Sequence, residues 1–176
     1  MLPAIADRRS IRRYKEEPVP REAIEAVLQA GILAPSSKNR QPWRFVAATG
    51  RAKAEALGMM AAGLDREARR PLLPESSGYL SGARQTLAVV AQAPVAVFVI
   101  DALSPDPRSP QTPEERIYSL CNAQSIGACM ENMALTATAM GLGSCVPGWA
   151  AGRPQLWHWA IPMRTRRPGP GGASAM

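Results

Sequence analysis

Three residues near the N-terminus, Arg8, Ser10 and Arg12, are spaced so that they could bind one anion together. In an extended segment alternate side chains point to the same side, so two guanidinium groups and one hydroxyl group would converge. A guanidinium group offers a planar pair of donors that matches a phosphate, and the hydroxyl adds a further donor. A short basic stretch near a terminus is also commonly a solvated surface, and both interpretations stay open on these residues alone.

A second candidate is the polar segment at residues 34–43, which has the sequence Ala-Pro-Ser-Ser-Lys-Asn-Arg-Gln-Pro-Trp. Loops with many short hydrogen-bonding side chains often bind polar ligands, although such residues are also common in ordinary loops. Residues 21–33 predict an amphipathic helix before the loop, with Ile32 on its apolar stripe and Gly31 as an unfavourable interior residue. Residues 43–48 predict a strand after it, so a helix and a strand would fix the two ends of the loop.

The longest periodic segment of the chain, residues 114–140, predicts a single long helix. Thr112 is placed to cap its N-terminus, with Glu115 three residues later as in a capping box. From residue 117 onward the only charged residue of this helix is Glu131, so a membrane span has to be considered. Polar side chains such as Asn122 weaken that alternative. The many small residues instead favour a helix buried at the centre of the domain or of a dimer.

The remaining segments complete an α+β pattern. They predict helices at residues 3–7, 52–62 and 80–92, and a strand at residues 95–100. That strand is a continuous apolar run, which is typical of a strand covered on both faces. A small mixed or antiparallel sheet flanked by helices, with a long central helix, is the expected fold. Residues 69–78 are expected to be mobile, and residues 66–78 are expected to cover the substrate side of a site.

The composition indicates one globular domain, with 46% hydrophobic and 20% charged residues among 176. The net charge of +7 invites a nucleic-acid-binding interpretation. The arginines form separate clusters without interleaved aromatic residues, however, which argues against nucleic acid as a partner. Three cysteines without metal-ligand spacing and a single histidine predict no metal site. The cysteine usage and the lack of an apolar N-terminal leader predict a cytoplasmic protein.

Three motifs occur in a fixed order along the chain: Arg8-Arg9-Ser10-Ile11-Arg12, the Pro-Ser-x-x-Asn-x-Gln-Pro-Trp loop, and Gly141-Leu142-Gly143 after the long helix. In this order and spacing the chain resembles the nitroreductase family over residues 5–144. The resemblance implies a nitroreductase-like fold and a homodimeric flavoprotein with FMN sites at the dimer interface. It also implies ping-pong transfer of reducing equivalents from NAD(P)H to a small acceptor such as a nitroaromatic or a quinone. No catalytic protein residue is implied, because the cofactor carries the redox step.

The FMN-binding residues that the resemblance implies fall into three groups. The first would hold the phosphate and ribityl end and consists of Arg8, Arg9, Ser10 and Arg12. The second would approach the flavin from the partner subunit and consists of Pro35, Ser36, Ser37, Asn39 and Gln41. The third would line the ring or phosphate side of the pocket and consists of Gly141, Leu142 and Gly143.

The last part of the chain departs from the family pattern, which continues with another helix, a strand and a basic arm. After Glu131 there is no Asp or Glu, and Arg, Pro, Gly and Trp accumulate. We therefore divide the chain into a nitroreductase-like FMN-binding domain at residues 1–145 and an atypical basic tail at residues 146–176. We hypothesise a frameshift or truncation shortly after Ser144, and the alternative is a divergent natural C-terminus. On either interpretation the last strand is expected to be missing, and an inactive chain without FMN is the alternative function.

Overall fold

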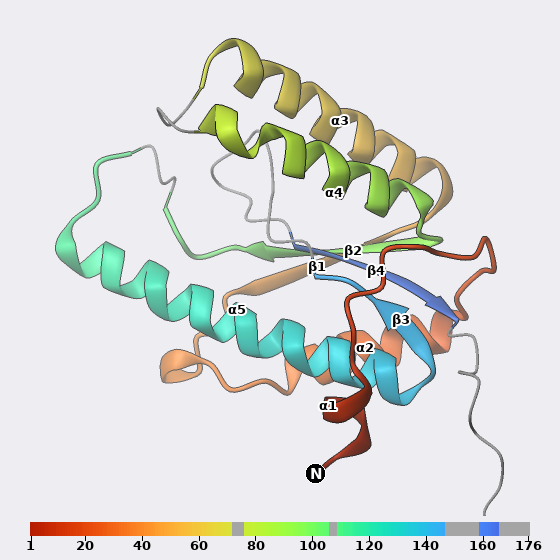
Figure 1. Cartoon of the computed structure of the whole chain (residues 1–176). Helices are drawn as coiled ribbons and strands as arrows, with labels where there is room; N and C mark the ends of the chain where they lie inside the picture. Colours follow the sequence, from red (N-terminus) through yellow and green to blue (C-terminus); the bar gives the residue numbers. More distant parts are fainter. Residues whose placement is uncertain (72–75, 106–108, 147–158, 166–176) are drawn as a thin grey trace, which may run out of the picture.

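The computed structural model describes residues 1–71, 76–105, 109–146 and 159–165, and its elements follow the expected α+β order (Figure 1). The helices are α1 (Pro3–Asp7), α2 (Arg21–Ile32), the 3-10 helix η1 (Ser37–Asn39), α3 (Gly50–Arg69), the 3-10 helix η2 (Ser76–Tyr79), α4 (Leu80–Gln92) and α5 (Pro113–Ala139). The strands are β1 (Trp43–Ala48), β2 (Val95–Asp101), β3 (Leu142–Ser144) and β4 (Trp159–Thr165).

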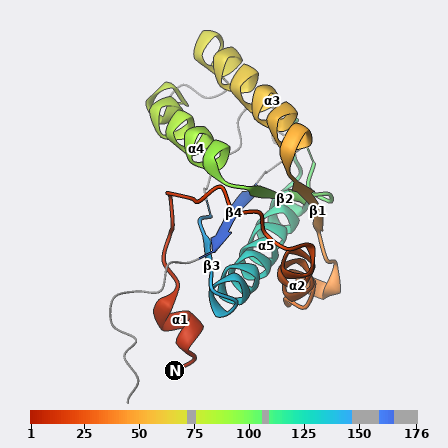
Figure 2. The same ribbon diagram turned by 90° about the vertical axis from the view of Figure 1, so that its right-hand side faces the viewer.

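Two helical layers enclose the sheet. Helices α3 and α4 cover one face, and α2 and the long helix α5 cover the other face (Figure 1). Figure 2 shows the same two layers end on, with α1 lying outside them beside the C-terminal end of α5. The described parts of the chain contain no helix that combines the length and the apolar character needed to cross a membrane.

The sheet is antiparallel and has the strand order β1-β2-β4-β3. Strand β4 pairs with β2 through Val97 and Ile161 and with β3 through Gly143 and Arg164. The expectation that the last strand is missing is therefore wrong. Strand pairing uses backbone N–H and C=O groups, so the unusual composition of this region did not rule it out. Most of the predicted tail, at residues 147–158 and 166–176, lies outside the described residues.

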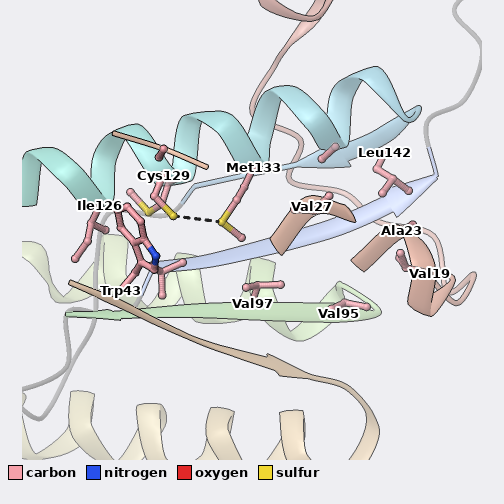
Figure 3. Close-up of a cluster of buried hydrophobic side chains, with 14 residues drawn as sticks. Val19, Ala23, Val27, Trp43, Val95, Val97, Ile126, Cys129, Met133 and Leu142 are labelled. Atoms are coloured by element: carbon pink, nitrogen blue, oxygen red, sulfur yellow. Dashed lines mark hydrogen bonds between the residues drawn. The ribbon is translucent and has the colours of Figure 1, made fainter. Parts of the chain in front are cut away.

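Strand β2 is the centre of the hydrophobic core, which confirms the prediction of a strand covered on both faces. Its alternate side chains divide between the two helical layers, as expected for a period of two. Val97 and its neighbours on the same face pack with Trp43, Ile126 and Met133 beneath α2 and α5 (Figure 3). Phe98 faces the other way and joins a second cluster beneath α3 and α4.

Helix α3 is longer than the predicted 52–62, because it continues to Arg69. Leu64 and Glu67 in the added turns are buried, and Asp65 forms an ion pair of 2.9 Å with Arg84 of α4. Arg69, the first residue of the segment expected to be mobile, is thus the last residue of this helix. The rest of the segment expected to be mobile includes residues 72–75, which lie outside the described residues.

Helix α2 lies very close to α5 at Gly31. A Cβ atom at position 31 would be 2.9 Å from the Cγ and Sδ atoms of Met133 and 3.0 Å from the Sγ atom of Cys129. Any side chain at position 31 would therefore force Met133 or Cys129 to shift, which gives a structural reason for an otherwise unfavourable helix residue. Ile32, expected on the buried stripe, is instead 40% exposed.

Helix α5 begins with the predicted capping box. The backbone N–H of Glu115 donates to Thr112 Oγ1 at 3.2 Å, and the backbone N–H of Thr112 donates to Glu115 Oε2 at 2.7 Å. One face of the helix is buried against α2 and the sheet. On the opposite face Ile117 and Leu120 are 60% and 66% exposed. The prediction of a buried helix therefore holds, within one chain, for only one face of α5.

Candidate functional site

The N-terminal segment runs extended beside the end of β3. Ser10 forms a parallel bridge with Ser144, and the backbone N–H of Ile11 donates to the carbonyl oxygen of Ser144 at 2.8 Å. This pairing holds the arginine-rich segment against the residues that follow the long helix. Two motifs that lie more than a hundred residues apart in the sequence are thereby neighbours in space.

A pocket of about 190 Å³ opens between this segment, α5 and the end of β3. Its lining residues come from three parts of the chain: Arg8 and Ser10; Gly127, Met130, Glu131 and Ala134; and Ser144, Cys145 and Val146. The polar side chains of Arg8, Ser10 and Glu131 are thus combined with small and apolar residues of α5. Such a combination suits a ligand with one anionic end.

Arg8 has a carboxylate partner in this pocket. Its Nε atom lies 3.5 Å from Oε1 of Glu131, and the two side chains are 37% and 55% exposed. An ion pair this exposed contributes little to stability and is readily exchanged. Arg8 is therefore available to a stronger anion such as a phosphate.

Ser10 and Arg12 both act on the thiol of Cys145. Burial raises the pKa of Cys145, while the charge of Arg12 and a hydrogen bond with Ser10 act in the opposite direction. The structure therefore places Arg8 and Ser10 in one pocket with residues 144–146, and Arg12 close enough to Cys145 for its charge to act on the thiol.

Arg9 is oriented differently. Its guanidinium group donates to the carbonyl oxygens of Ala6 at 2.7 Å and Arg8 at 2.8 Å. It also lines a separate small cavity of about 30 Å³ together with Leu142 and Gly143. Among the described residues, Arg8 is the one arginine of the motif that lines the larger pocket, whereas Arg9 lines the smaller cavity.

The loop at residues 35–42 is fixed against the first half of α5. The backbone N–H of Ser37 donates to Ser125 Oγ at 3.2 Å. Within the loop, the backbone N–H of Gln41 donates to Ser36 Oγ at 3.1 Å, and its side-chain amide donates to Asn39 Oδ1 at 3.2 Å. Pro35 at the start of the loop is exposed. The polar side chains expected to bind a ligand are thus held mainly by one another and by α5.

This loop and the N-terminal pocket lie at different positions along α5. The loop contacts Tyr118 and Ser125, whereas the pocket is lined by residues from Gly127 onward. Tyr118 and Glu131 are 13 positions apart, which corresponds to about 20 Å at 1.5 Å per residue. None of the described loop residues is among those that line the N-terminal pocket of the same chain.

The segment after α5 contributes to both cavities. Gly141 has a φ angle of +74°, a conformation that favours glycine and turns the chain directly into β3. Leu142 is 5% exposed, and its side chain belongs to the core. The sequence prediction ended at Gly143 and missed Ser144 and Cys145, which line the larger pocket. Their position immediately after a predicted site motif was the available signal.

The cysteines do not form a redox or metal centre in the described residues. Cys129 lies in the core, where burial raises its pKa to about 12 and keeps it a neutral thiol. Cys121, Cys129 and Cys145 are all free. No group of His, Cys, Asp and Glu residues in the described part of the chain could hold a metal ion.

The fold and the pocket define an α+β domain in which a basic N-terminal segment and a long helix surround a pocket that contains both Arg8 and Glu131. The chain belongs to the nitroreductase family, whose sequence model matches residues 5–153. The family prediction and the predicted fold class are thereby confirmed. The match also continues beyond Ser144 into the first residues of the predicted tail.

Individual relatives agree with this assignment. A 5,6-dimethylbenzimidazole synthase from Rhodospirillum rubrum is 33% identical over 152 residues, which cover 82% of this chain and 65% of that protein. A protein from Desulfovibrio desulfuricans, solved in complex with FMN, has a TM-score of 0.63 and 26% identity over 99% of this chain and 91% of its own. An NADH dehydrogenase from Thermus thermophilus is 51% identical over 43 residues, 24% of this chain and 21% of that protein. The chain thus spans less than two thirds of the length of the Rhodospirillum and Thermus proteins.

Proposed function

We propose that this protein is an FMN-dependent oxidoreductase that transfers reducing equivalents from NAD(P)H to a small acceptor such as a nitroaromatic or a quinone. The observation that carries the proposal is the pocket in which Arg8 and Ser10 face the end of β3 and the middle of α5. Membership of the nitroreductase family and the FMN bound to the Desulfovibrio relative support the same cofactor. A ping-pong sequence, in which donor and acceptor use the same face in turn, is part of the proposal.

The donor set fits the phosphate end of FMN. Arg8 and Arg12 would supply charge-assisted hydrogen bonds to the phosphate and Ser10 a further donor. Glu131 would have to give up its ion pair with Arg8, which is exposed and weak. When bound, FMN supplies the redox chemistry, and the protein residues bind and orient it.

The pocket of one chain is too small for the whole cofactor. It encloses about 190 Å³, whereas sites for molecules of this size usually enclose about 300–1,000 Å³. Additional walls are therefore needed, and we propose that a second copy of the chain supplies them. The exposed apolar residues Ile117 and Leu120 on α5 support a homodimer built on this helix. The loop at residues 35–41 would then reach the flavin held by the partner.

The cofactor proposal is tested on the purified full chain. We expect a yellow protein that binds one FMN per subunit and whose flavin absorbance is bleached by NADPH or NADH under anaerobic conditions. Addition of a nitroaromatic or a quinone should restore the absorbance. A colourless protein that takes up no added FMN would refute the proposal and favour an inactive family member.

The dimer proposal is tested by placing a charge on the exposed face of α5. Leu120→Glu should raise the dimer dissociation constant by at least about tenfold, since an unpaired carboxylate would be buried in the interface. Analytical ultracentrifugation over a concentration series measures this constant, and FMN retention should fall with it. Met59→Glu is the matched control, because Met59 is 68% exposed on α3 and remote from α5. Equal dissociation constants in both variants would exclude α5 as the interface.

A second candidate activity is the synthesis of 5,6-dimethylbenzimidazole. It is favoured by the length of the match to the Rhodospirillum enzyme, which covers 82% of this chain. Mass spectrometry of the products formed by the FMN-loaded protein with NADPH in air would detect it. Absence of 5,6-dimethylbenzimidazole together with turnover of a nitroaromatic would reject it and leave the first candidate.

A further inference from the structure

We propose that Lys38, Arg40 and Tyr118 form an anion-recognition site for the molecule that exchanges electrons with the flavin. The ligand group would be a phosphate or a carboxylate carried by the electron donor or the acceptor. This inference rests on the proposed function, because it is the partner's flavin that the loop at residues 35–41 would approach. It adds a determinant of substrate choice that the family assignment does not contain.

The geometry gathers three donor groups around one aromatic ring. The Cζ atom of Arg40 lies 4.4 Å from the centroid of the Tyr118 ring, and Nζ of Lys38 lies 5.4 Å from the same centroid. The ammonium group of Lys38 also donates to the Tyr118 hydroxyl oxygen at 3.4 Å. The hydroxyl hydrogen of Tyr118 therefore remains free to point to an anion. Cation–π attraction explains how each cation is held on the ring, but it leaves both positive charges uncompensated.

No acidic side chain in the described residues forms an ion pair with Lys38 or Arg40. The acidic residues nearest to Tyr118 in sequence are Glu114 and Glu115, about one turn earlier on α5. Glu115 is already engaged by the backbone N–H and the hydroxyl of Thr112. Two like charges held on one ring repel each other, and a bound anion would remove that repulsion.

The backbone holds these cations in place before any ligand binds. Lys38, Asn39 and Gln41 have φ angles of 49°, 53° and 47°, in the left-handed region that non-glycine residues rarely adopt. The hydrogen bonds from Ser37 to Ser125 and from Gln41 to Ser36 fix the loop on both sides of them. Such conformations are typical of sites where side chains must be preorganised.

Within one chain, the cluster lies apart from the pocket assigned to the FMN phosphate. Tyr118 is about 20 Å along α5 from Glu131 in the N-terminal pocket. In the proposed dimer the loop that carries the cluster approaches the partner's flavin, and the ligand assigned to the cluster is the molecule that reacts there, either the nicotinamide dinucleotide or the acceptor. The 2′-phosphate of NADPH and the carboxylate of a nitrobenzoate present the same chemistry to two cations and a hydroxyl. Kinetic comparison of the two kinds of ligand identifies which one uses the site.

The test compares the double variant Lys38→Gln/Arg40→Gln with the control Arg21→Gln/Arg51→Gln. The control also removes two positive charges, which in this case belong to exposed i, i+4 ion pairs on α2 and α3. We measure kcat/KM for NADPH against NADH, and for 4-nitrobenzoate against nitrobenzene. In wild type and control, kcat/KM should be roughly tenfold or more higher for NADPH than for NADH, or for 4-nitrobenzoate than for nitrobenzene. The double variant should lose this preference for the more anionic ligand. Ratios unchanged in the double variant, with unchanged FMN content, would overturn the proposal.

A calorimetric titration separates this inference from the cofactor proposal. The probes are adenosine 2′,5′-bisphosphate against adenosine 5′-monophosphate, and 4-nitrobenzoate against nitrobenzene. Binding that favours the more anionic probe in wild type and control, but not in the double variant, supports the site even if the protein takes up no FMN. Equal binding of the probes to all three proteins overturns the site even if the protein is yellow and active.

Discussion

Replacing Arg8 and Arg12 by alanine is expected to abolish retention of FMN during purification. Each guanidinium group that donates to the phosphate should contribute about 1–3 kcal/mol, since the hydrogen bonds are charge-assisted. Arg8 lines the pocket, and Arg12 lies near enough to Cys145 of the pocket lining for its charge to act on that thiol. Titration of the apoprotein with FMN, followed by quenching of flavin fluorescence, measures the loss for each single variant and for the double variant.

Arg9→Ala is the matched control for these variants. The Arg9 guanidinium group is bound to the carbonyl oxygens of Ala6 and Arg8 and lines the smaller cavity. Its removal should therefore change FMN affinity by less than about threefold, as for an ordinary surface residue. Unchanged affinity in both Arg8→Ala and Arg12→Ala would refute their phosphate role. An equally large loss in Arg9→Ala would instead support a phosphate contact for all three arginines, as the family resemblance implies.

Gly31→Leu is expected to destabilise the fold by about 1–3 kcal/mol or more, because the new side chain would be forced into a packed core. The space that it needs is occupied by Met133 and Cys129, which are both completely buried. Neither helix can move away without opening the contact between α2 and α5. Urea denaturation followed by circular dichroism measures the change in the free energy of unfolding.

The same substitution at Gly58 provides the control. Gly58 lies within α3, and a Cβ atom there would meet no other atom within 4 Å. Gly58→Leu should therefore be neutral or stabilising by up to about 1 kcal/mol, since leucine favours the helix more than glycine does. Similar stability of the two variants would show that the helices separate easily and that the close approach at Gly31 is not a constraint.

Much of the fold could be predicted because its signals are local. The apolar run at residues 95–100 and the capping box at Thr112 each depend on a few neighbouring residues, and the structure confirms both. The extended alternation of Arg8, Ser10 and Arg12 is also local, and the structure places Arg8 and Ser10 in one pocket. Whether they bind FMN stays a prediction.

The features that sequence reasoning missed depend on contacts between distant segments. Ser144 becomes part of the pocket only because it pairs with Ser10. The importance of Gly31 becomes visible only when Met133 is placed opposite it, and Arg9 departs from the motif because nearby carbonyl groups bind it. Strand β4 was missed for a different reason, since composition was used to judge a segment whose pairing depends on the backbone. Tyr118 likewise gains significance only through the loop that lies on it.

The central place of β2 between β1 and β4 has a consequence for folding during synthesis. Strand β2 ends at Asp101, but its second neighbour ends at Thr165, 64 residues later. At translation rates of about 5–20 residues per second, one edge of β2 stays unpaired for roughly 3–13 seconds after it is made. That edge belongs to the apolar segment Val-Ala-Val-Phe-Val-Ile, and exposed strand edges of this kind promote aggregation. The yield of native protein in a cell should therefore depend on how well chaperones protect this strand until β4 arrives.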